Sequence, residues 1–242
     1  MENIIIFGAT GAIGSAIAHQ LTADGASLYL AGRNESELSS LASELGASHG
    51  ICDAMDENSI AHVIEQAKEN GPITGLIWAI GSILLKPLGK ITADDFQNTF
   101  YLNVTAAGLA IKQASESLRE GKGSVLLFSS VAASQGFTAH GAISAAKAGV
   151  EGLAVALATE LAPDVRINVI APSLSQSKMA APLLSNEMMA KGIAQAHPLR
   201  RIGNAQDFAP LSAMLMDNQR SGWITGAVIN VDGGRSSLRT KG

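Results

Sequence analysis

The stretch Ile4-Ile5-Ile6-Phe7-Gly8-Ala9-Thr10-Gly11-Ala12-Ile13-Gly14 decides the fold of this chain. Its β-branched and aromatic start predicts a short buried strand, and the pattern after it predicts a helix over Ala12–Asp24. Glycines between a strand and a helix let the backbone approach a pyrophosphate, and the helix N-terminus offers free N–H groups. The spacing G-x-x-G-x-x-G therefore predicts dinucleotide binding, although glycines also occur in the turns of α/β proteins that bind nothing. The loop residues expected to contact the cofactor are Gly8, Thr10, Gly11, Ile13 and Gly14.

Strand and helix patterns alternate along the rest of the chain. The further predicted strands are Ser27–Ala31, His49–Cys52, Gly75–Trp78, Ser124–Ser129, Val165–Ala171 and Val228–Val231. The further predicted helices are Glu35–Leu45, Asn58–Glu69, Ala93–Asn103, Thr105–Arg119, Ala142–Leu161, Glu187–Ala196 and Gln206–Met216. This alternation predicts strand–helix–strand units and thus an α/β fold: a doubly wound, seven-stranded parallel sheet of the Rossmann type, forming a single domain over residues 1–242.

Composition and charge exclude several classes of protein. The chain has 242 residues, of which 47% are hydrophobic, so it can bury a large core. The net charge is −4 and no Lys/Arg-rich run exists, so we expect no nucleic-acid partner. Cys52 is the only cysteine, which excludes an internal disulfide and a thiolate metal cluster, and we expect no metal. With neither a signal-peptide pattern nor 18 consecutive apolar residues, we expect a cytoplasmic protein with no membrane partner.

The end of the second predicted strand indicates which dinucleotide binds. An acidic residue about 20 positions after the glycine loop would hold the ribose 2′-hydroxyl of NAD. The chain instead reads Ala31-Gly32-Arg33-Asn34, and a guanidinium suits a phosphate group. We therefore expect NADP(H) rather than NAD(H), with Arg33 and Asn34 in contact with it. The alternative is a solvated Arg33 with Glu35 on the ribose, but Glu35 is expected in the first turn of the next helix, where a negative charge is favourable.

Together with these features, further short motifs resemble the short-chain dehydrogenase/reductase family over essentially the whole chain. They are Trp78-Ala79-Ile80-Gly81, Phe100-Tyr101-Leu102-Asn103, Phe128-Ser129-Ser130, Ala145–Gly149, Pro172-Ser173, His197–Gly203, Ile224-Thr225-Gly226 and Val231–Gly234. Of the family's Asn-Asn-Ala-Gly after strand four, only Gly81 survives. The resemblance implies that Asp53 lies near the adenine. It also implies cofactor contacts at Ala54, Ala79, Gly81, Lys147, Pro172, Ser175 and Ser177.

The resemblance also implies catalytic roles. Ser130 would donate a hydrogen bond to the substrate oxygen, Lys147 would hold the nicotinamide ribose, and Asn103 would kink its helix and hold a relay water. The family's active site reads Tyr-x-x-x-Lys, with the serine thirteen positions before the tyrosine. Counting back four from Lys147, or forward thirteen from Ser130, leads to Ile143, and neither of the chain's two tyrosines occupies that position. The expected proton donor is therefore absent.

His140 is the leading candidate to replace that donor. The spacing of His140, Ile143, Ser144 and Lys147 would place all four on one helical face, with Lys147 pointing back toward His140. Histidine can donate a proton near neutral pH. The enoyl-acyl-carrier-protein reductase branch of the family uses Tyr-x6-Lys, and His140-x6-Lys147 has that spacing, whereas Ser130 follows the carbonyl reductases. The alternatives are a surface or cap role for His140, and Ser144 as a second candidate donor.

Three functional hypotheses follow. The first is NADPH-dependent reduction of a carbonyl compound, or oxidation of the matching alcohol. The second is an enoyl reductase-like activity, and the third is an NADP-binding sensor or partner subunit with little turnover. The substrate, a small molecule, would lie under a lid at residues 173–196, although the apolar residues there could instead be packing core; they are Met179, Leu183, Leu184, Met188 and Met189. The resemblance further implies a homo-tetramer or homo-dimer.

Overall fold

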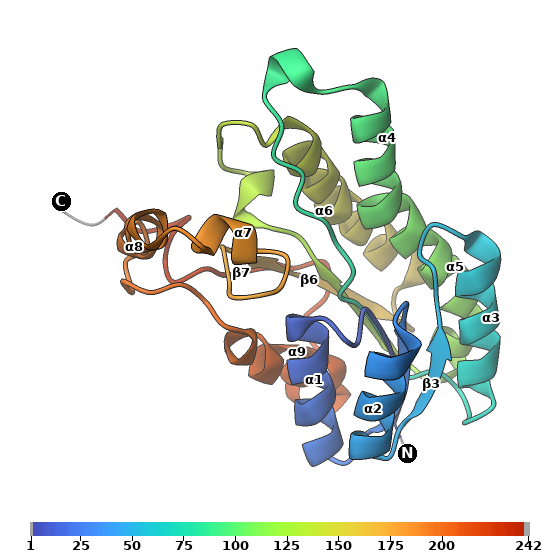
Figure 1. The fold of residues 1–242 in the computed structure, drawn as a ribbon. Coiled ribbons are helices and arrows are strands. Elements are labelled where there is room, and N and C mark those ends of the chain that lie inside the picture. Colours follow the sequence, from blue (N-terminus) through green and yellow to red (C-terminus); the bar gives the residue numbers. More distant parts are fainter. Residues whose placement is uncertain (1, 240–242) are drawn as a thin grey trace.

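The computed structural model describes residues 2–239 and contains, within them, one sheet of seven parallel strands in the order β3-β2-β1-β4-β5-β6-β7 (Figure 1). The strands are β1 (Asn3–Phe7), β2 (Ser27–Gly32), β3 (Ser48–Ile51), β4 (Gly75–Trp78), β5 (Ser124–Phe128), β6 (Arg166–Pro172) and β7 (Val228–Val231). This order confirms the predicted doubly wound α/β fold. Because the chain leaves β1 toward β2 and later returns to place β4 on its other side, a crevice opens at the carboxyl ends of β1 and β4.

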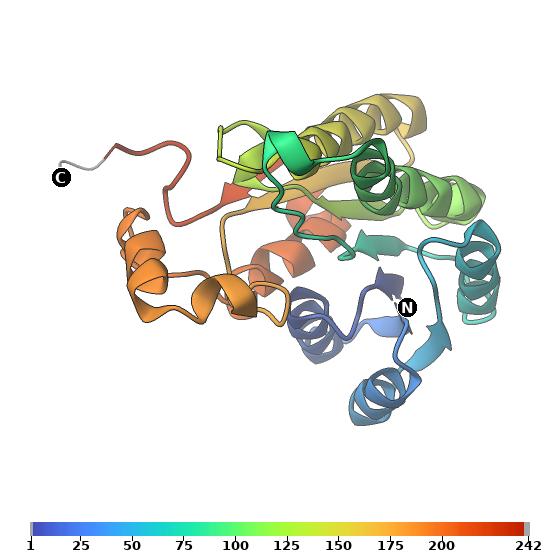
Figure 2. The ribbon, with the colours of Figure 1, turned by 45° about the horizontal axis from the view of Figure 1, so that its top comes forward.

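Helices cover both faces of the sheet. One layer holds α1 (Ala12–Ala23), α2 (Glu35–Leu45) and α9 (Ala209–Met216), and the other holds α3 (Glu57–Lys68), α5 (Ala106–Glu120) and α6 (Gly141–Leu161). Figure 2 shows these two layers on opposite sides of the strands. The shorter helices are α4 (Ala93–Phe100), α7 (Ala181–Leu184), α8 (Glu187–Gln195) and α10 (Asn218–Ser221).

The first strand shows why the sequence chooses this architecture. Ile4 and Ile6 pack on the face that α1 and α9 cover, while Ile5 and Phe7 pack on the other face, and all four side chains are buried. A strand that is covered on both faces reads as a continuous apolar run rather than an alternation. The run Ile4-Ile5-Ile6-Phe7 therefore indicates a strand that is covered by helices on both faces of the sheet.

The segment between α4 and α5 departs from a regular helix. Tyr101–Thr105 forms a π-helical turn, labelled η2, where two separate helices were predicted with a boundary near Asn103. The Asn103 amide donates to the Thr99 carbonyl oxygen, 2.9 Å away, and so competes with the backbone for that acceptor. π-turns of this kind widen a helix locally and often occur at functional sites.

Helix α6 is long and apolar enough to cross a membrane by length and composition alone, with a mean hydropathy of 1.3 over an 18-residue window. In the structure it packs along the sheet, and its buried side includes Ala142, Ala146, Val150 and Ala154. Core helices of sheet proteins commonly have the same length and composition. Packing on the sheet therefore accounts for the apolar residues on the buried side of α6.

Candidate active site

The glycine loop lies at the carboxyl end of β1, at the crevice between β1 and β4. Gly8 has a φ of +78°, and a Cβ atom there would lie 3.0 Å from the backbone of Ala79. A Cβ atom on Gly14 would come closer to the Gly8 carbonyl oxygen than real Cβ atoms come to an oxygen. The Gly8 N–H donates to the Ala31 carbonyl oxygen at 2.9 Å, which ties the loop to β2. Only glycine fits these positions, and the first turn of α1 is left accessible to a ligand.

A pocket of about 1300 Å³ runs from this loop across the carboxyl ends of the strands. It brings together most of the residues that the sequence assigned to the site. They are Thr10, Gly11, Ile13, Gly14, Ala79, Gly81, Ser130, His140, Lys147, Pro172, Ser175 and Ser177. Gly8, the first residue of the loop, does not line the pocket and lies against Ala79. Residues from the ends of β1, β4, β5 and β6 thus meet in one cavity, as the topology of the sheet requires.

Lys147 is a buried cation within this pocket. It extends from α6 with only 7% of its surface exposed, and its Nζ donates to the Phe128 carbonyl oxygen at the end of β5, 2.8 Å away. Burial lowers the pKa of Lys147 to about 8. The Phe128 carbonyl oxygen supplies the acceptor that a buried ammonium needs. Among the described residues no hydrogen bond joins Lys147 to His140, although both line the pocket.

The side chains of Asn103 and Lys147 converge on Gly81. A Cβ atom on Gly81 would lie 3.2 Å from the Lys147 Nζ and 3.3 Å from the Asn103 Oδ1. This Oδ1 is buried and accepts no hydrogen bond from any described residue, while the Asn103 amide nitrogen donates to Ser82 Oγ at 3.2 Å. A buried acceptor without a partner, such as Asn103 Oδ1, is expected to bind a hydroxyl or a water. The pair therefore fits the ribose and the relay water that the family resemblance implies.

Ser130 and Ile143 lie in the same pocket but differ in chemistry. Ser130 follows β5, and its Oγ accepts from the Ala132 N–H at 3.2 Å, so its hydroxyl hydrogen is free to donate. Ile143 lies one turn before Lys147 on α6, is 5% exposed and lines the pocket. Its side chain has no donor.

His140 occupies the N-cap position of α6 and not a position within the helix. Its carbonyl oxygen accepts from the Ser144 N–H at 2.8 Å, but its side chain makes no cap hydrogen bond. Its Nδ1 lies 2.7 Å from the Thr138 carbonyl oxygen, so Nδ1 carries a hydrogen and donates. Nε2 can then give up a proton only from the imidazolium form. His140 lines the pocket, whereas Ser144 does not.

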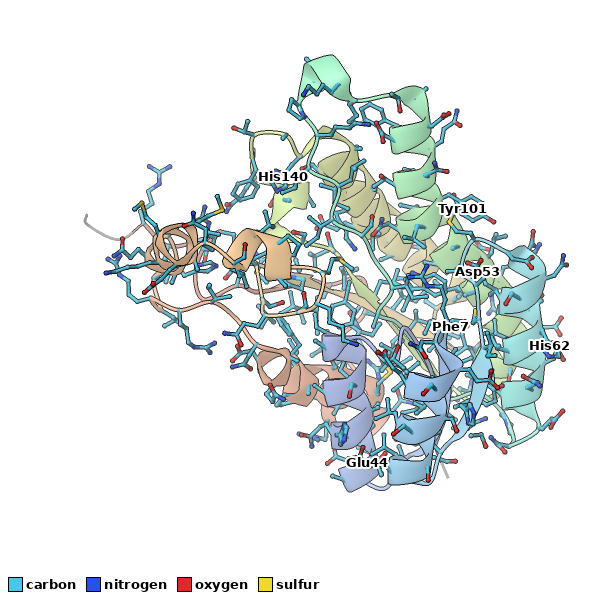
Figure 3. All side chains as sticks on the ribbon, viewed as in Figure 1. Phe7, Glu44, Asp53, His62, Tyr101 and His140 are labelled. Carbon is cyan, nitrogen blue, oxygen red and sulfur yellow. The ribbon has the colours of Figure 1, made fainter. Side chains whose placement is uncertain are left out.

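The residues predicted to bind the adenosine half lie outside this pocket, at the ends of β2 and β3. These strands pair in register Gly32↔Ile51, so Arg33 and Asp53 follow neighbouring strand ends. Both side chains are exposed, and Asp53 Oδ1 accepts from the Met55 N–H at 2.9 Å. Figure 3 shows Asp53 beside α3, well apart from His140 near the start of α6. The predicted adenosine-binding residues are thus far from the predicted proton donor His140.

The start of α2 follows the sequence-based expectation for Glu35. Glu35 lies in the first turn of α2, and Asn34 is the N-cap residue, accepting from the Glu37 N–H at 3.2 Å. The Asn34 side chain is therefore engaged with the helix end. Ala54, which follows Asp53, is buried in the core beneath α3.

The segment predicted as a lid forms α7 and α8, drawn in orange at the edge of the molecule in Figure 2. Met179, Leu183 and Ile193 line the pocket from this segment. Met188 is 84% exposed and is not part of the pocket lining. One side of the segment is thus an apolar wall of the pocket.

Two pairs of residues that line the pocket had no site role assigned to them from the sequence. Ser173 Oγ lies 2.8 Å from His197 Nε2, and the other ring nitrogen of His197 lies 2.7 Å from the Ile193 carbonyl oxygen. Arg235 lies over the ring of Phe137, with Cζ 5.6 Å from the ring centroid. The one local signal for Arg235 is its place directly after the glycine turn that ends the last strand.

The fold and the glycine loop define a Rossmann-type dinucleotide-binding protein, and comparison with known proteins narrows the class. A family model described as enoyl-(acyl carrier protein) reductase matches residues 8–236. The chain is 30% identical over 234 residues to a 3-oxoacyl-[acyl-carrier-protein] reductase of Bos taurus, covering 95% of each chain. It is 31% identical over 242 residues to a tropinone reductase homologue of Arabidopsis thaliana, covering 96% of this chain and 92% of the relative.

Solved structures agree with these relatives. A short-chain type dehydrogenase/reductase from Mycobacterium ulcerans superposes with a TM-score of 0.92 at 28% identity, covering 98% of this chain and 90% of that one. The chain belongs to the short-chain dehydrogenase/reductase family, a family of NAD(P)-dependent oxidoreductases.

Proposed function

We propose that this protein is an NADP(H)-dependent oxidoreductase that transfers a hydride between the nicotinamide and a carbonyl or alcohol substrate. The observation that carries the proposal is the convergence of the Lys147 ammonium and the unpaired Asn103 oxygen on Gly81. Gly81 and Lys147 line a pocket that continues to the glycine loop, whereas the buried Asn103 does not line it. The nicotinamide, when bound, supplies or accepts the hydride. The chain supplies binding, orientation and proton movement.

The proposed roles follow from the geometry of each side chain. The glycine loop and the N-terminus of α1 bind the pyrophosphate. Lys147 holds the ribose hydroxyls, and Ser130 donates a hydrogen bond to the substrate oxygen, where charge develops during reduction. An alkoxide oxygen must receive a proton, and either the His140 imidazolium or a water held by Asn103 provides it. Residues 173–196 act as the lid over the substrate.

Ile143 makes this an atypical member of the family under our proposal, and it sets the first experiment. We expect His140→Ala to lower kcat for carbonyl reduction by about 100-fold or more, because a positioned acid is lost. We expect Ile143→Tyr to restore turnover in the His140→Ala background, since it returns a donor to the position one turn before Lys147. The measurement is NADPH oxidation with a panel of ketones, quinones and enoyl compounds.

His62→Ala is the matched control for the histidine, because His62 is exposed on α3 and does not line the pocket. Turnover that is unchanged in His140→Ala would rule out the histidine acid and leave the relayed water as the source of the proton.

Cofactor preference tests the role of Arg33. We expect NADPH to bind more tightly than NADH, and Arg33→Ala to weaken NADPH binding by about 10- to 100-fold while NADH binding changes little, because only NADPH carries the 2′-phosphate. Fluorescence titration of both cofactors provides the affinities. Arg220→Ala is the control, since Arg220 is an exposed arginine on α10. A wild-type preference for NADH would contradict the assignment of Arg33.

The same panel of compounds also tests two alternative functions. The absence of a donor at Ile143 favours an NADP-binding sensor or partner subunit, which would show tight NADPH binding and no turnover with any compound. The His140-x6-Lys147 spacing favours an enoyl reductase-like activity, which would show turnover with the enoyl compounds alone.

We also propose a homo-dimer or homo-tetramer in the cytoplasm. Phe96 and Phe100 on α4 and Val155 on α6 are about half exposed, and Trp223, which precedes the edge strand β7, is fully exposed. Apolar surface of this kind commonly marks a protein interface. Light scattering that finds only a monomer would contradict the assembly, and cell fractionation tests the location.

A further inference from the structure

We infer that the substrate of this site carries an oxyanion, a carboxylate or a phosphate, and that Arg235 binds it. The inference rests on the proposed function, because it assigns a substrate class to the same pocket. The pocket is lined by Lys147, Lys178 and Arg235, and no Asp or Glu of residues 2–239 lines it. A cavity with one sign of charge concentrates ligands of the opposite sign.

Of these three cations, Arg235 is the one whose charged group has no polar partner within the described chain. Lys147 donates to the Phe128 carbonyl oxygen at 2.8 Å, and Lys178 pairs with Glu37 at 2.7 Å. The Arg235 guanidinium makes no hydrogen bond or ion pair with any described residue. An oxyanion in the pocket would therefore find Arg235 available without breaking an existing bond.

The turn after β7 fixes the backbone of Arg235. Gly233 and Gly234 have φ values of +62° and +82°, which glycine adopts without strain. The carboxylate of Asp232 accepts from the Gly234 N–H at 2.9 Å and from the N–H and hydroxyl of Ser236. Burial by itself raises the pKa of Asp232, but these hydrogen bonds outweigh burial and hold the pKa below its ordinary value. Asp232 is thus an ionised carboxylate committed to the turn, and it forms no ion pair with Arg235.

Phe137 orients the guanidinium. Arg235 Cζ lies 5.6 Å from the centroid of the Phe137 ring, and this ring lies 5.2 Å from the ring of His140. A guanidinium stacked on an aromatic face keeps its N–H donors in its own plane, where they match the two oxygens of a carboxylate or phosphate. Arg235 thus lies over an aromatic ring while its guanidinium N–H groups have no partner among the described residues, an arrangement that suits a residue that recognises an anion.

Arg235 and Phe137 lie away from the places where the cofactor phosphates are expected to bind. Phe137 and His140 belong to the connection between β5 and α6, whereas the cofactor phosphates would lie at the glycine loop before α1 and near Arg33. In Figure 3, His140 lies near the start of α6, on the other side of the molecule from α2. Leu183 and Ile193 line the same pocket from the lid segment. A carbonyl compound with an apolar body and an anionic group fits this arrangement.

The experiment compares charged and neutral forms of one carbonyl compound. The substrates are a 4-oxo carboxylic acid, its methyl ester and the phosphate ester of a keto alcohol. The proteins are the wild type, Arg235→Gln, Arg235→Lys and Arg239→Gln. Arg239 is the matched control, because it is an exposed arginine four residues later that does not line the pocket. The readouts are kcat and KM for NADPH oxidation with each substrate.

We expect the wild type to prefer an anionic substrate. Arg235→Gln should lower the ratio of kcat/KM for anion over ester by about 10- to 100-fold, mainly through KM, because a charge-assisted hydrogen bond to the substrate is lost. Arg235→Lys should restore part of the ratio, since lysine keeps the charge without the paired donors, and Arg239→Gln should keep the wild-type ratio. The anion with the larger effect, carboxylate or phosphate, identifies the group. An equal ratio in wild type and Arg235→Gln would overturn the inference.

A binding measurement separates this inference from the proposed function. If no carbonyl compound oxidises NADPH, the oxidoreductase proposal fails. Calorimetric titration with a saturated carboxylic acid of the same length, which cannot react, still tests the anion site. Binding that is lost in Arg235→Gln and kept in Arg239→Gln supports the site, and binding that is the same in all variants, or absent in the wild type, overturns it. Should Arg235→Gln fail to fold by circular dichroism, Arg235→Lys is measured instead, and because lysine keeps the charge without the paired donors, a partial loss of binding supports the site and unchanged binding overturns it.

Discussion

Replacing Lys147 by methionine should lower kcat/KM for carbonyl reduction by at least about 100-fold, an effect on the order of 3 kcal/mol in the barrier. Methionine has a similar length and packs in apolar surroundings, so it occupies the buried position on α6 without the charge. The variant loses the donor that, in our proposal, holds the ribose beside Asn103 and Gly81. NADPH oxidation and NADPH affinity are the measurements. Lys112→Met is the control, because the Lys112 side chain is 69% exposed on α5.

The same variant has a readout that needs no substrate. Burial lowers the pKa of Lys147 to about 8, from an ordinary value of 10.5. Between these two values the unfolded chain binds more protons at this site than the folded chain, so the Lys147 contribution to the free energy of unfolding rises with pH. Below pH 8 both states are protonated, and the folded state bears the full cost of the buried charge. Wild type should therefore gain stability relative to Lys147→Met as the pH rises from 8 to 10.5.

Urea unfolding of both proteins across this range measures the difference. A stability difference that does not change with pH would contradict the assignment of a lowered pKa to Lys147, whatever the substrate of the protein proves to be.

The second large effect is expected at Gly14, where alanine should reduce NADPH affinity by at least about 100-fold and lower the free energy of unfolding by about 1–3 kcal/mol. The added Cβ would collide with the Gly8 carbonyl oxygen, a backbone atom that cannot rotate away. That carbonyl oxygen also accepts from the Gly11 N–H at 3.0 Å, so the whole phosphate-binding turn would shift. Cofactor titration and urea unfolding measure the two effects.

Helix propensity alone predicts that Gly14→Ala raises the free energy of unfolding, because alanine favours a helix by about 1 kcal/mol over glycine. Gly152→Ala is therefore the matched control. Gly152 lies within α6 and is exposed, and a Cβ atom there would meet nothing within 4 Å beyond the nearby backbone of its own helix, so alanine should stabilise the protein. A stabilising Gly14→Ala would show that the close approach in the glycine loop is not tight.

Much of the fold could be predicted from local patterns. The strand β1 begins one residue earlier than Ile4, and β2 and β6 differ from the expected bounds by a residue, because strands buried on both faces read as apolar runs that have clear ends. The break between α4 and α5 was also visible, but the π-turn was not, since it arises when the Asn103 side chain takes the Thr99 carbonyl oxygen.

The side-chain directions could not be predicted in the same way. Helical spacing placed His140 and Lys147 on one helical face, whereas in the structure His140 is the cap residue before the helix. It also gave no sign that the Lys147 Nζ donates to the end of β5. The burial of Lys147 needs a carbonyl oxygen that the helix itself does not provide. Residue spacing predicts which side chains share a face of α6, but it carries no information about the acceptor on β5.

The sequence by itself determined the parallel sheet and the glycine loop, because strand patterns and turn chemistry are local properties of the chain. The resemblance to the family added Ser130, Asn103 and Lys147 as candidate site residues. Only the tertiary structure decided that Asn103 and Lys147 converge on Gly81, and that Arg235 lies over Phe137 in the same pocket. Parallel strands bring their carboxyl ends to one edge of the sheet, so residues from distant segments meet there. The free energy that holds them together comes from packing between layers, which no single segment encodes.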